Sequence, residues 1–173
     1  MLIVVLGDTH IPDHARALPS ALAPYLERAD LILHTGDVTA RSVLDELIRF
    51  APVRVALGNN DRPEIAAWGA EEEVRLTVEE VEVAMVHDSG PRPGREGRLR
   101  RRFPGAGLII FGHSHIPIDA EFDGVRLFNP GSPTWKRRQP FPTFGLIDVS
   151  GGRVRARVVE LPVTPATTRR PSG

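Results

Sequence analysis

The sequence predicts a single α/β domain, and three observations support this. Short apolar runs, which suit buried strands, alternate with segments that can be helical. Polar residues able to bind a metal follow directly after five of these runs. The chain has 173 residues, of which 41% are hydrophobic, and this is enough for one domain with a proper core.

In the first two-thirds of the chain we expect a strand at each of five apolar runs, one further strand just before 81–86, and two helices. The apolar runs lie at 2–6, 31–33, 53–57, 81–86 and 108–111. The helices are expected over 19–28 and 42–50, although Pro24 weakens the first, and Ser42 is placed to cap the second. The segment "EEEVRLTVEEVEVAMVH" alternates with period two, which predicts two strands joined by a tight turn near Glu79–Glu80.

The last third predicts antiparallel strands, at 118–122, 125–128, 143–149 and 153–161. Asp123-Gly124 and the Ser-Gly-Gly sequence at 150–152 supply the turns between them. We therefore expect one domain over residues 1–161. Residues 162–173 contain too little apolar surface to pack, and we expect a disordered tail there.

Composition excludes several classes of protein. The 22 basic and 22 acidic residues give zero formal charge, which argues against a protein that coats nucleic acid or an anionic membrane. No cysteine is present, so disulfides, thiolate zinc sites and iron–sulfur clusters are ruled out. The apolar opening is too short for a signal peptide or a membrane span, and we expect a cytoplasmic protein with no membrane partner.

Metal-binding side chains collect at the ends of the five apolar runs. In open α/β sheets ligands bind at the carboxyl ends of the strands, and parallel neighbouring strands would bring these ends to one edge. Four of the six histidines belong to this group. The candidate ligands are Asp8, His10, Asp37, Asn59, His87, His113 and His115.

The sequence "FGHSHIP" carries two histidines on either side of Ser114. In extended backbone, residues two apart point the same way, so His113 and His115 can reach one site. Asp8 and His10 repeat this spacing. A glycine precedes Asp8, Asp37, Asn59 and His113, and we expect it to let the backbone turn sharply.

This ligand set suits two metal ions that share a carboxylate. Four imidazoles, two carboxylates and a carboxamide are too many for one ion. Imidazole with oxygen and without sulfur favours Mn²⁺, Fe²⁺, Ni²⁺, Co²⁺ or Zn²⁺ over Mg²⁺ or Ca²⁺ alone. Two divalent ions beside two aspartates leave a positive site, which favours a phosphate ester, and paired metals about 3.5–4 Å apart suit phosphoryl transfer to water.

The order of these motifs resembles the calcineurin-like metallophosphoesterases. Asp-x-His, Gly-Asp, Gly-Asn, a strand-end His and Gly-His-x-His follow one another over roughly residues 1 to 150. The small size, "DTHIP", "NPGS" at 129–132 and "PTFGLIDV" are most similar to the compact bacterial and archaeal phosphodiesterase branch.

The resemblance implies a four-layer αββα sandwich with two mixed β-sheets. It implies that one metal is held by Asp8, His10, Asp37 and His115. It implies that the other is held by Asp37, Asn59, His87 and His113. Asp37 would bridge two ions, with Mn²⁺ the first choice. A metal-bridging hydroxide would attack phosphorus while the metals, Asn59 and His87 stabilise the developing charge.

Two positions depart from the family pattern. Many members that cleave monoesters carry a histidine after the motif asparagine, as a candidate acid for the leaving group, where this chain has Asn60. Some relatives have Gly-His where this chain has Asp88-Ser89. Neither change touches the metal ligands, but both affect protonation of the leaving group, which favours diesters or activated leaving groups.

Other residues carry weaker expectations. His34 and Asp61 are expected to support the ligands from outside, although His34 can simply pack and Asp61 can simply stabilise its turn. The arginine run 92–102 reads first as a solvated helix face, yet Arg92 and Arg95 begin at the rim of the site and can meet substrate phosphates. His14 reads as a surface histidine or as the missing proton donor.

The function predicted is a metal-dependent phosphodiesterase acting on a small phosphate ester. The alternative is a protein-binding scaffold on the same fold, like the retromer subunit that resembles these enzymes, with weak or no catalysis. Nucleic-acid processing would depend on the arginine run and is the weakest of the three.

Overall fold

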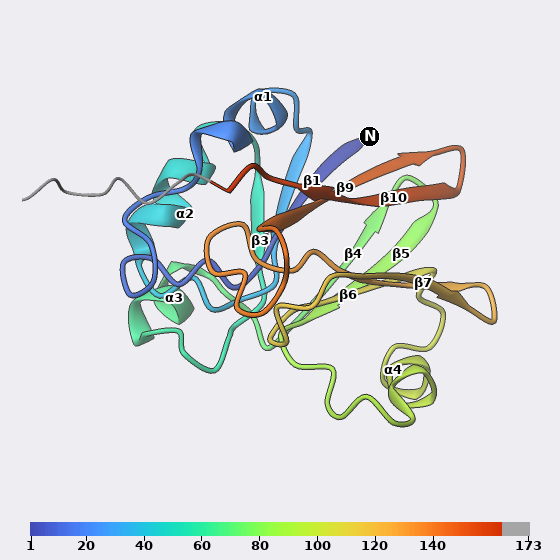
Figure 1. Ribbon diagram of the computed structural model, residues 1–173. Coiled ribbons are helices and arrows are strands. Elements are labelled where there is room, and N and C mark those ends of the chain that lie inside the picture. The colour runs from blue at the N-terminus through green and yellow to red at the C-terminus, as the bar shows by residue number, and fades with distance from the viewer. Residues whose placement is uncertain (164–173) are drawn as a thin grey trace, which may run out of the picture.

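The computed structural model describes residues 1–163, and its strands form two five-stranded mixed sheets (Figure 1). The first sheet has the order β10-β9-β1-β2-β3, in which β1, β2 and β3 are parallel. Its strands are β1 (Leu2–Leu6), β2 (Leu31–His34), β3 (Val53–Val55), β9 (Thr143–Ser150) and β10 (Arg153–Glu160).

The second sheet has the order β4-β5-β6-β8-β7, in which β5, β6 and β8 are parallel. Its strands are β4 (Glu73–Val78), β5 (Val81–Val86), β6 (Leu108–Phe111), β7 (Ile118–Phe122) and β8 (Val125–Asn129). The helices are a 3₁₀ turn (Ser20–Leu22), α1 (Ala23–Leu26), α2 (Arg41–Leu47), α3 (Pro63–Trp68) and α4 (Arg95–Arg102).

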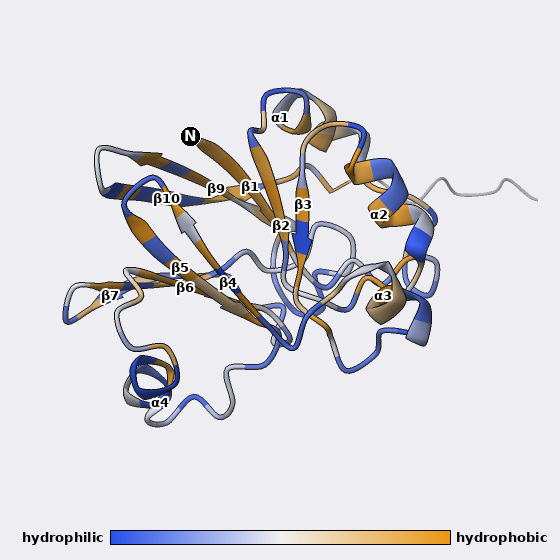
Figure 2. Cartoon of the chain, turned by 180° about the vertical axis from the view of Figure 1, so that it is seen from behind, coloured by the Kyte–Doolittle hydropathy of each residue, from blue (hydrophilic) through white to orange (hydrophobic). Residues whose placement is uncertain are grey.

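Three apolar layers join these elements into an αββα sandwich, as predicted. Residues of β1 alternate between two layers: Val4 packs toward the helices with Leu44 of α2, and Ile3 packs between the sheets with Ile110 of β6. The third layer, which includes Leu99 of α4, lies on the outer face of the second sheet. Burial on both faces explains why the central strands are apolar throughout (Figure 2).

The predicted strands are confirmed with shifts of one or two residues at some ends. The predicted helix over 19–28 is shorter, because a 3₁₀ turn occupies its start. The capping role expected of Ser42 is wrong, since α2 begins at Arg41 and no side chain caps it. The helix α3 was not predicted. The tail predicted over 162–173 lies outside the described residues from 164 onward.

The arginine run forms α4, and structural contacts occupy most of its guanidinium groups. Arg98 donates to the Pro93 carbonyl at 2.7 Å, and Arg100 pairs with Asp123 at 2.6 Å. Arg102 pairs with Glu73 at 2.6 Å. These contacts favour the solvated-helix interpretation of the run over nucleic-acid binding.

The five predicted strand ends belong to two sheets. The ends of β1, β2 and β3 lie in the first sheet, and those of β5 and β6 lie in the second. The expectation of one sheet edge is therefore wrong in detail, but the two edges adjoin, and the candidate ligands meet between them. Among residues 1–163, no helix is long and apolar enough to cross a membrane.

Candidate metal centre

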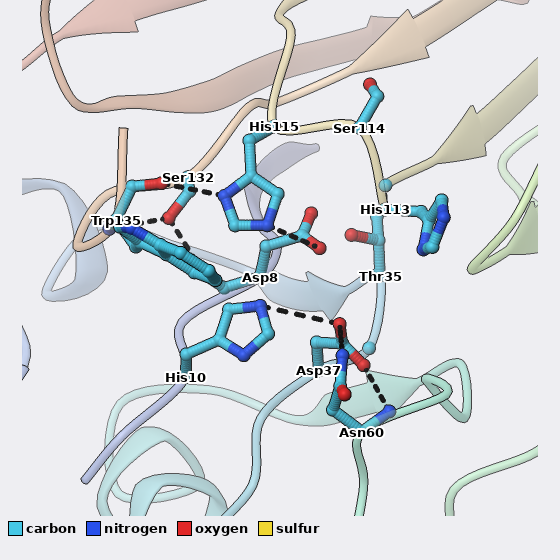
Figure 3. Close-up of polar contacts among 12 residues, drawn as sticks. Asp8, His10, Thr35, Asp37, Asn60, His113, Ser114, His115, Ser132 and Trp135 are labelled. Carbon is cyan, nitrogen blue, oxygen red and sulfur yellow. Dashed lines mark hydrogen bonds and ion pairs between the residues drawn. The ribbon is translucent and has the colours of Figure 1, made fainter. Parts of the chain in front are cut away.

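Two groups of candidate ligands lie side by side where the sheet edges meet. Figure 3 shows Asp8, His10 and His115 of one group beside Asp37 of the other. We call Asp8, His10 and His115 the Asp8 cluster, and Asp37, His87 and His113 the Asp37 cluster. In each cluster, one ligand atom per residue lies within 4.8 Å of the others. Of the six side chains only His113 is exposed.

The Asp37 carboxylate joins the two clusters. Its Oδ2 lies 3.4 Å from Nε2 of His10 and 3.5 Å from Nε2 of His87. One oxygen thus faces an imidazole from each cluster, which is the placement that a bridging ligand requires.

Backbone carbonyls orient two of the imidazoles. Nδ1 of His87 donates to the Thr35 carbonyl at 2.8 Å, and Nδ1 of His115 donates to the Trp135 carbonyl at 2.7 Å. With the proton on Nδ1, the neutral ring presents the Nε2 lone pair to its cluster. This is the second contact that metal-binding histidines almost always make.

Nitrogen and oxygen atoms of the candidate ligands converge in both clusters. Nε2 of His87 lies 3.0 Å from Oδ1 of Asn59, and Nδ1 of His113 lies 2.9 Å from the same oxygen. In the Asp8 cluster, both Asp8 carboxylate oxygens and Nε2 of His10 and His115 are buried without a hydrogen-bond partner. Such groups are costly unless a cation lies among them, so these residues fit the metal ions that the sequence predicted.

The pKa values of four candidate ligands are shifted, and the shifts suit a site that binds cations. Burial, reinforced by the charge of Asp37, raises the pKa of Asp8 well above its usual range. Burial also lowers the pKa of His10, and lowers that of His115 to about 4. For Asp37, burial opposes ionisation, but His87 and the hydrogen bonds from Asn60 outweigh it and lower the pKa. Neutral imidazoles beside carboxylates are what divalent metals require.

The expected extended backbone of "GHSH" is wrong. His113 and His115 have φ angles of 66° and 58°, in the left-handed region. The strand-like alternation therefore does not apply, and the two histidines enter different clusters. Asp8 and His10 also have positive φ, at 51° and 45°, yet both enter the Asp8 cluster. Non-glycine residues in this region concentrate at functional sites.

The four glycines that precede ligands act mainly through their lack of a side chain. Only Gly36 has a positive φ, of 100°. A Cβ on Gly58 would overlap the backbone nitrogen of Asp37, and one on Gly7 or Gly112 would overlap the Thr35 hydroxyl. Close approach of neighbouring turns, more than turn geometry, thus explains these glycines.

Asp61 ties the Asp37 turn to the turn after β3. Its carboxylate accepts backbone N–H groups from Asp37 at 3.1 Å, Thr39 at 2.9 Å and Gly58 at 2.8 Å. Asp61 therefore holds the backbone of the turn that carries Asp37, and its bond to Gly58 also closes the turn after β3.

Replacing Asp61 by alanine is expected to lower the free energy of unfolding by roughly 3 kcal/mol, because partly buried backbone donors lose a charged acceptor. The measurement is urea denaturation of the metal-free protein. Asp30→Ala is the matched control, since exposed Asp30 accepts only the backbone N–H of Leu2. Equal losses in both variants would contradict this role.

His34 lies outside both clusters. It is fully buried, its Nδ1 accepts the Gly36 N–H at 3.2 Å, and its Nε2 lies 3.2 Å from the Thr9 hydroxyl. Burial lowers its pKa to about 3, so the ring is neutral. It holds the turns that carry the ligands and makes no contact with the Asp37 carboxylate.

Asn60 makes two hydrogen bonds to Asp37. Its backbone N–H donates to Oδ1 at 2.8 Å, and its side-chain amide donates to Oδ2 at 2.7 Å (Figure 3). In the sequence, Asn60 departs from the family pattern, in which many members have a histidine at this position. Its role as a clamp on the carboxylate between the clusters is visible only in the structure.

Arg92 and Arg95 line a cavity of about 390 Å³ that also includes His113 and Ser89. The guanidinium carbon of Arg95 lies 5.1 Å from the centre of the Phe111 ring, and its buried Nε has no hydrogen-bond partner. Both arginines are thus beside the Asp37 cluster, at the rim where the sequence placed them.

The segment 129–137, which begins with the last residue of β8, is a part of the site that the sequence does not predict. Asn129 donates from Nδ2 to the Gly112 carbonyl at 2.9 Å, and Ser132 donates to the Asp8 carbonyl at 2.8 Å. Trp135 accepts the hydrogen bond from His115. The motif "NPGS" is the available sequence signal for this segment.

Clustered imidazoles and carboxylates at the adjoining sheet edges of a four-layer αββα sandwich fit the metallophosphoesterase class. Residues 1–152 match the model of the calcineurin-like phosphoesterase superfamily domain, and the chain belongs to this superfamily. A probable metallophosphoesterase of Methanothermobacter thermautotrophicus is 36% identical over 163 residues, which cover 92% of each chain.

Solved structures share the fold. The Zn²⁺ complex of Vps29 from Entamoeba histolytica superposes with a TM-score of 0.75 at 24% identity, and covers 92% of this chain and 99% of Vps29. A structure described as a novel archaeal phosphodiesterase has a TM-score of 0.73 at 22% identity, and covers 92% of this chain and all of its own. The predicted family and fold are confirmed.

Proposed function

We propose that this protein is a dinuclear metal-dependent phosphodiesterase. The observation that carries the proposal is the Asp37 carboxylate, which lies between His10 of the Asp8 cluster and His87 of the Asp37 cluster. The buried ligand atoms of the Asp8 cluster, which lack hydrogen-bond partners, support it. One ion would be held by Asp8, His10, Asp37 and His115. The other would be held by Asp37, Asn59, His87 and His113.

The donor set favours Mn²⁺ as the native metal, with Fe²⁺, Ni²⁺, Co²⁺ and Zn²⁺ as alternatives. When bound, two divalent ions supply Lewis-acid activation of water and of the phosphoryl group. The residues of the chain keep that centre in place. Asn60 holds the Asp37 carboxylate, and the carbonyls of Thr35 and Trp135 hold two imidazoles with Nε2 inward.

The preference for diesters follows from the side chain at residue 60. A carboxamide cannot protonate a leaving group. The side-chain amide of Asn60 also already donates a hydrogen bond to the Asp37 carboxylate. A diester with an activated or weakly basic leaving group needs such help least. The fold shared with an archaeal phosphodiesterase supports this preference.

We propose that Arg92 and Arg95 contact the substrate on the side of the site that the Asp37 cluster occupies. The unpartnered Nε of Arg95 and the cavity beside His113 support this role. Guanidinium groups bind phosphate oxygens through paired hydrogen bonds. The substrate would be a small phosphate ester. The cytoplasmic location of the protein stays a prediction.

A second candidate is a protein-binding scaffold. It is favoured by the fold shared with Vps29, one example of which was solved with Zn²⁺, so that metal binding on this fold does not by itself establish turnover. The buried donors fit both candidates, and only hydrolysis separates them.

The experiment is hydrolysis of bis-p-nitrophenyl phosphate by metal-stripped protein reconstituted with Mn²⁺. We expect metal-dependent turnover that is lost in His113→Ala, because the Asp37 cluster loses a ligand. Metal analysis accompanies the assay. Two bound ions without hydrolysis of diester or monoester would favour the scaffold, and absence of bound metal would contradict both the ligand assignment and the enzyme.

A further inference from the structure

The segment 129–137, which we call the Trp135 loop, is fastened to the turn after β1 that carries Asp8 and His10. The Ser132 hydroxyl donates to the Asp8 carbonyl at 2.8 Å, and the Thr134 hydroxyl donates to the Thr9 carbonyl at 2.6 Å. Ser132 Oγ also accepts the Trp135 N–H at 2.9 Å. The loop is therefore held in one position relative to the candidate metal ligands.

Trp135 packs its ring edge against the cluster. The centres of the His10 and His115 rings each lie 5.0 Å from the Trp135 ring centre, at interplanar angles of 87° and 90°. Figure 3 shows Trp135 beside His115 and His10. A rigid aromatic platform thus borders the Asp8 cluster.

Arg137 is stacked on this platform. Its guanidinium carbon lies 4.6 Å from the Trp135 ring centre. The His14 ring is also stacked on Trp135, with 3.4 Å between the ring centres and 11° between the ring planes. The Arg137 backbone adopts the left-handed region, with φ at 49°.

The Arg137 charge is uncompensated within residues 1–163. It has no salt bridge and no hydrogen bond there, and the side chain is exposed. By contrast, Lys136 donates to the Gln139 carbonyl at 2.8 Å.

We propose that Arg137 is a phosphate-binding residue of the site, which takes non-bridging oxygens of a phosphate ester, or of the phosphate product, next to the Asp8 cluster. The proposal deepens the proposed function and rests on it. A guanidinium that is already held by stacking loses little conformational freedom when it binds a ligand, and it presents several N–H donors in one plane. With Arg92 and Arg95 on the other side, cations would flank the two clusters.

The test is calorimetric titration of inorganic phosphate into Mn²⁺-loaded protein, which measures binding without turnover. Arg137→Ala is expected to weaken phosphate binding by roughly tenfold to a hundredfold, as the loss of charge-assisted hydrogen bonds does. Arg138→Ala is the matched control, because it removes the same charge from the neighbouring exposed residue. Arg138→Ala should change the affinity less than about twofold by screening alone. Manganese content should be the same in all three proteins.

Arg137→Lys keeps the charge but not the planar fork, and is expected to recover only part of the affinity. Phosphate affinity unchanged in Arg137→Ala, or reduced equally in Arg138→Ala, would overturn the proposal. Failure of the proposed function has a different signature. The wild-type protein would then bind phosphate in an Arg137-dependent manner but would not hydrolyse bis-p-nitrophenyl phosphate.

Discussion

Replacing Asp37 by asparagine is expected to reduce Mn²⁺-dependent hydrolysis of bis-p-nitrophenyl phosphate by on the order of a thousandfold or more. Loss of the shared carboxylate removes a negative ligand from both clusters, and metal-ion stabilisation of a phosphoryl transition state is worth several kcal/mol. Asparagine keeps the shape of the side chain and tolerates the left-handed backbone that Asp37 adopts, with φ at 55°.

Metal analysis separates loss of ions from loss of chemistry in this variant. We expect manganese content to fall below two ions per chain. The control is Asp123→Asn, which removes an exposed carboxylate that pairs with Arg100 of α4, away from the clusters. Full activity and full metal content in Asp37→Asn would show that Asp37 does not bridge two ions, and would require a different ligand assignment.

Metal binding is expected to raise the melting temperature of the stripped protein by roughly 5–10 °C per ion at a free Mn²⁺ concentration of a hundred times Kd. Saturation at that level stabilises the folded state by about 2.7 kcal/mol, and each kcal/mol corresponds to about 2–4 °C for a domain of this size. The physical source is the set of buried donors without partners, foremost the Asp8 carboxylate.

Asp8→Asn should raise the melting temperature of the metal-free protein and reduce the further rise that Mn²⁺ produces. Without metal the variant is expected to be more stable than the wild type at pH 7, because burial and the charge of Asp37 oppose ionisation of Asp8. With Mn²⁺ the variant should gain less than the wild type, since an anionic ligand is lost. Differential scanning calorimetry with and without chelator measures both. A variant less stable than wild type without metal would contradict the unfavourable charge at Asp8.

The strands and their order along the chain are determined by local information. Runs such as "LIVVL" and "LIIF" are apolar on both faces because helices or a second sheet cover each side, and their composition therefore indicates their burial. The candidate ligands follow these runs immediately, so their gathering at strand ends was predictable. Short helices are less so: α3 covers only Pro63–Trp68 and has no long apolar periodicity.

The tertiary structure determines how the candidate ligands are aimed and places His113 and His115 in different clusters. The family resemblance implies the same division, whereas the spacing of the two histidines alone does not. The left-handed backbone at His113 and His115 sends the two rings to different clusters, which a strand-like alternation cannot predict. The groups that orient His87 and His115 are the backbone carbonyls of Thr35 and Trp135. Every residue carries such a carbonyl, so no side-chain pattern marks the ones that matter. They act here because the chain brings distant turns together, and only packing determines that.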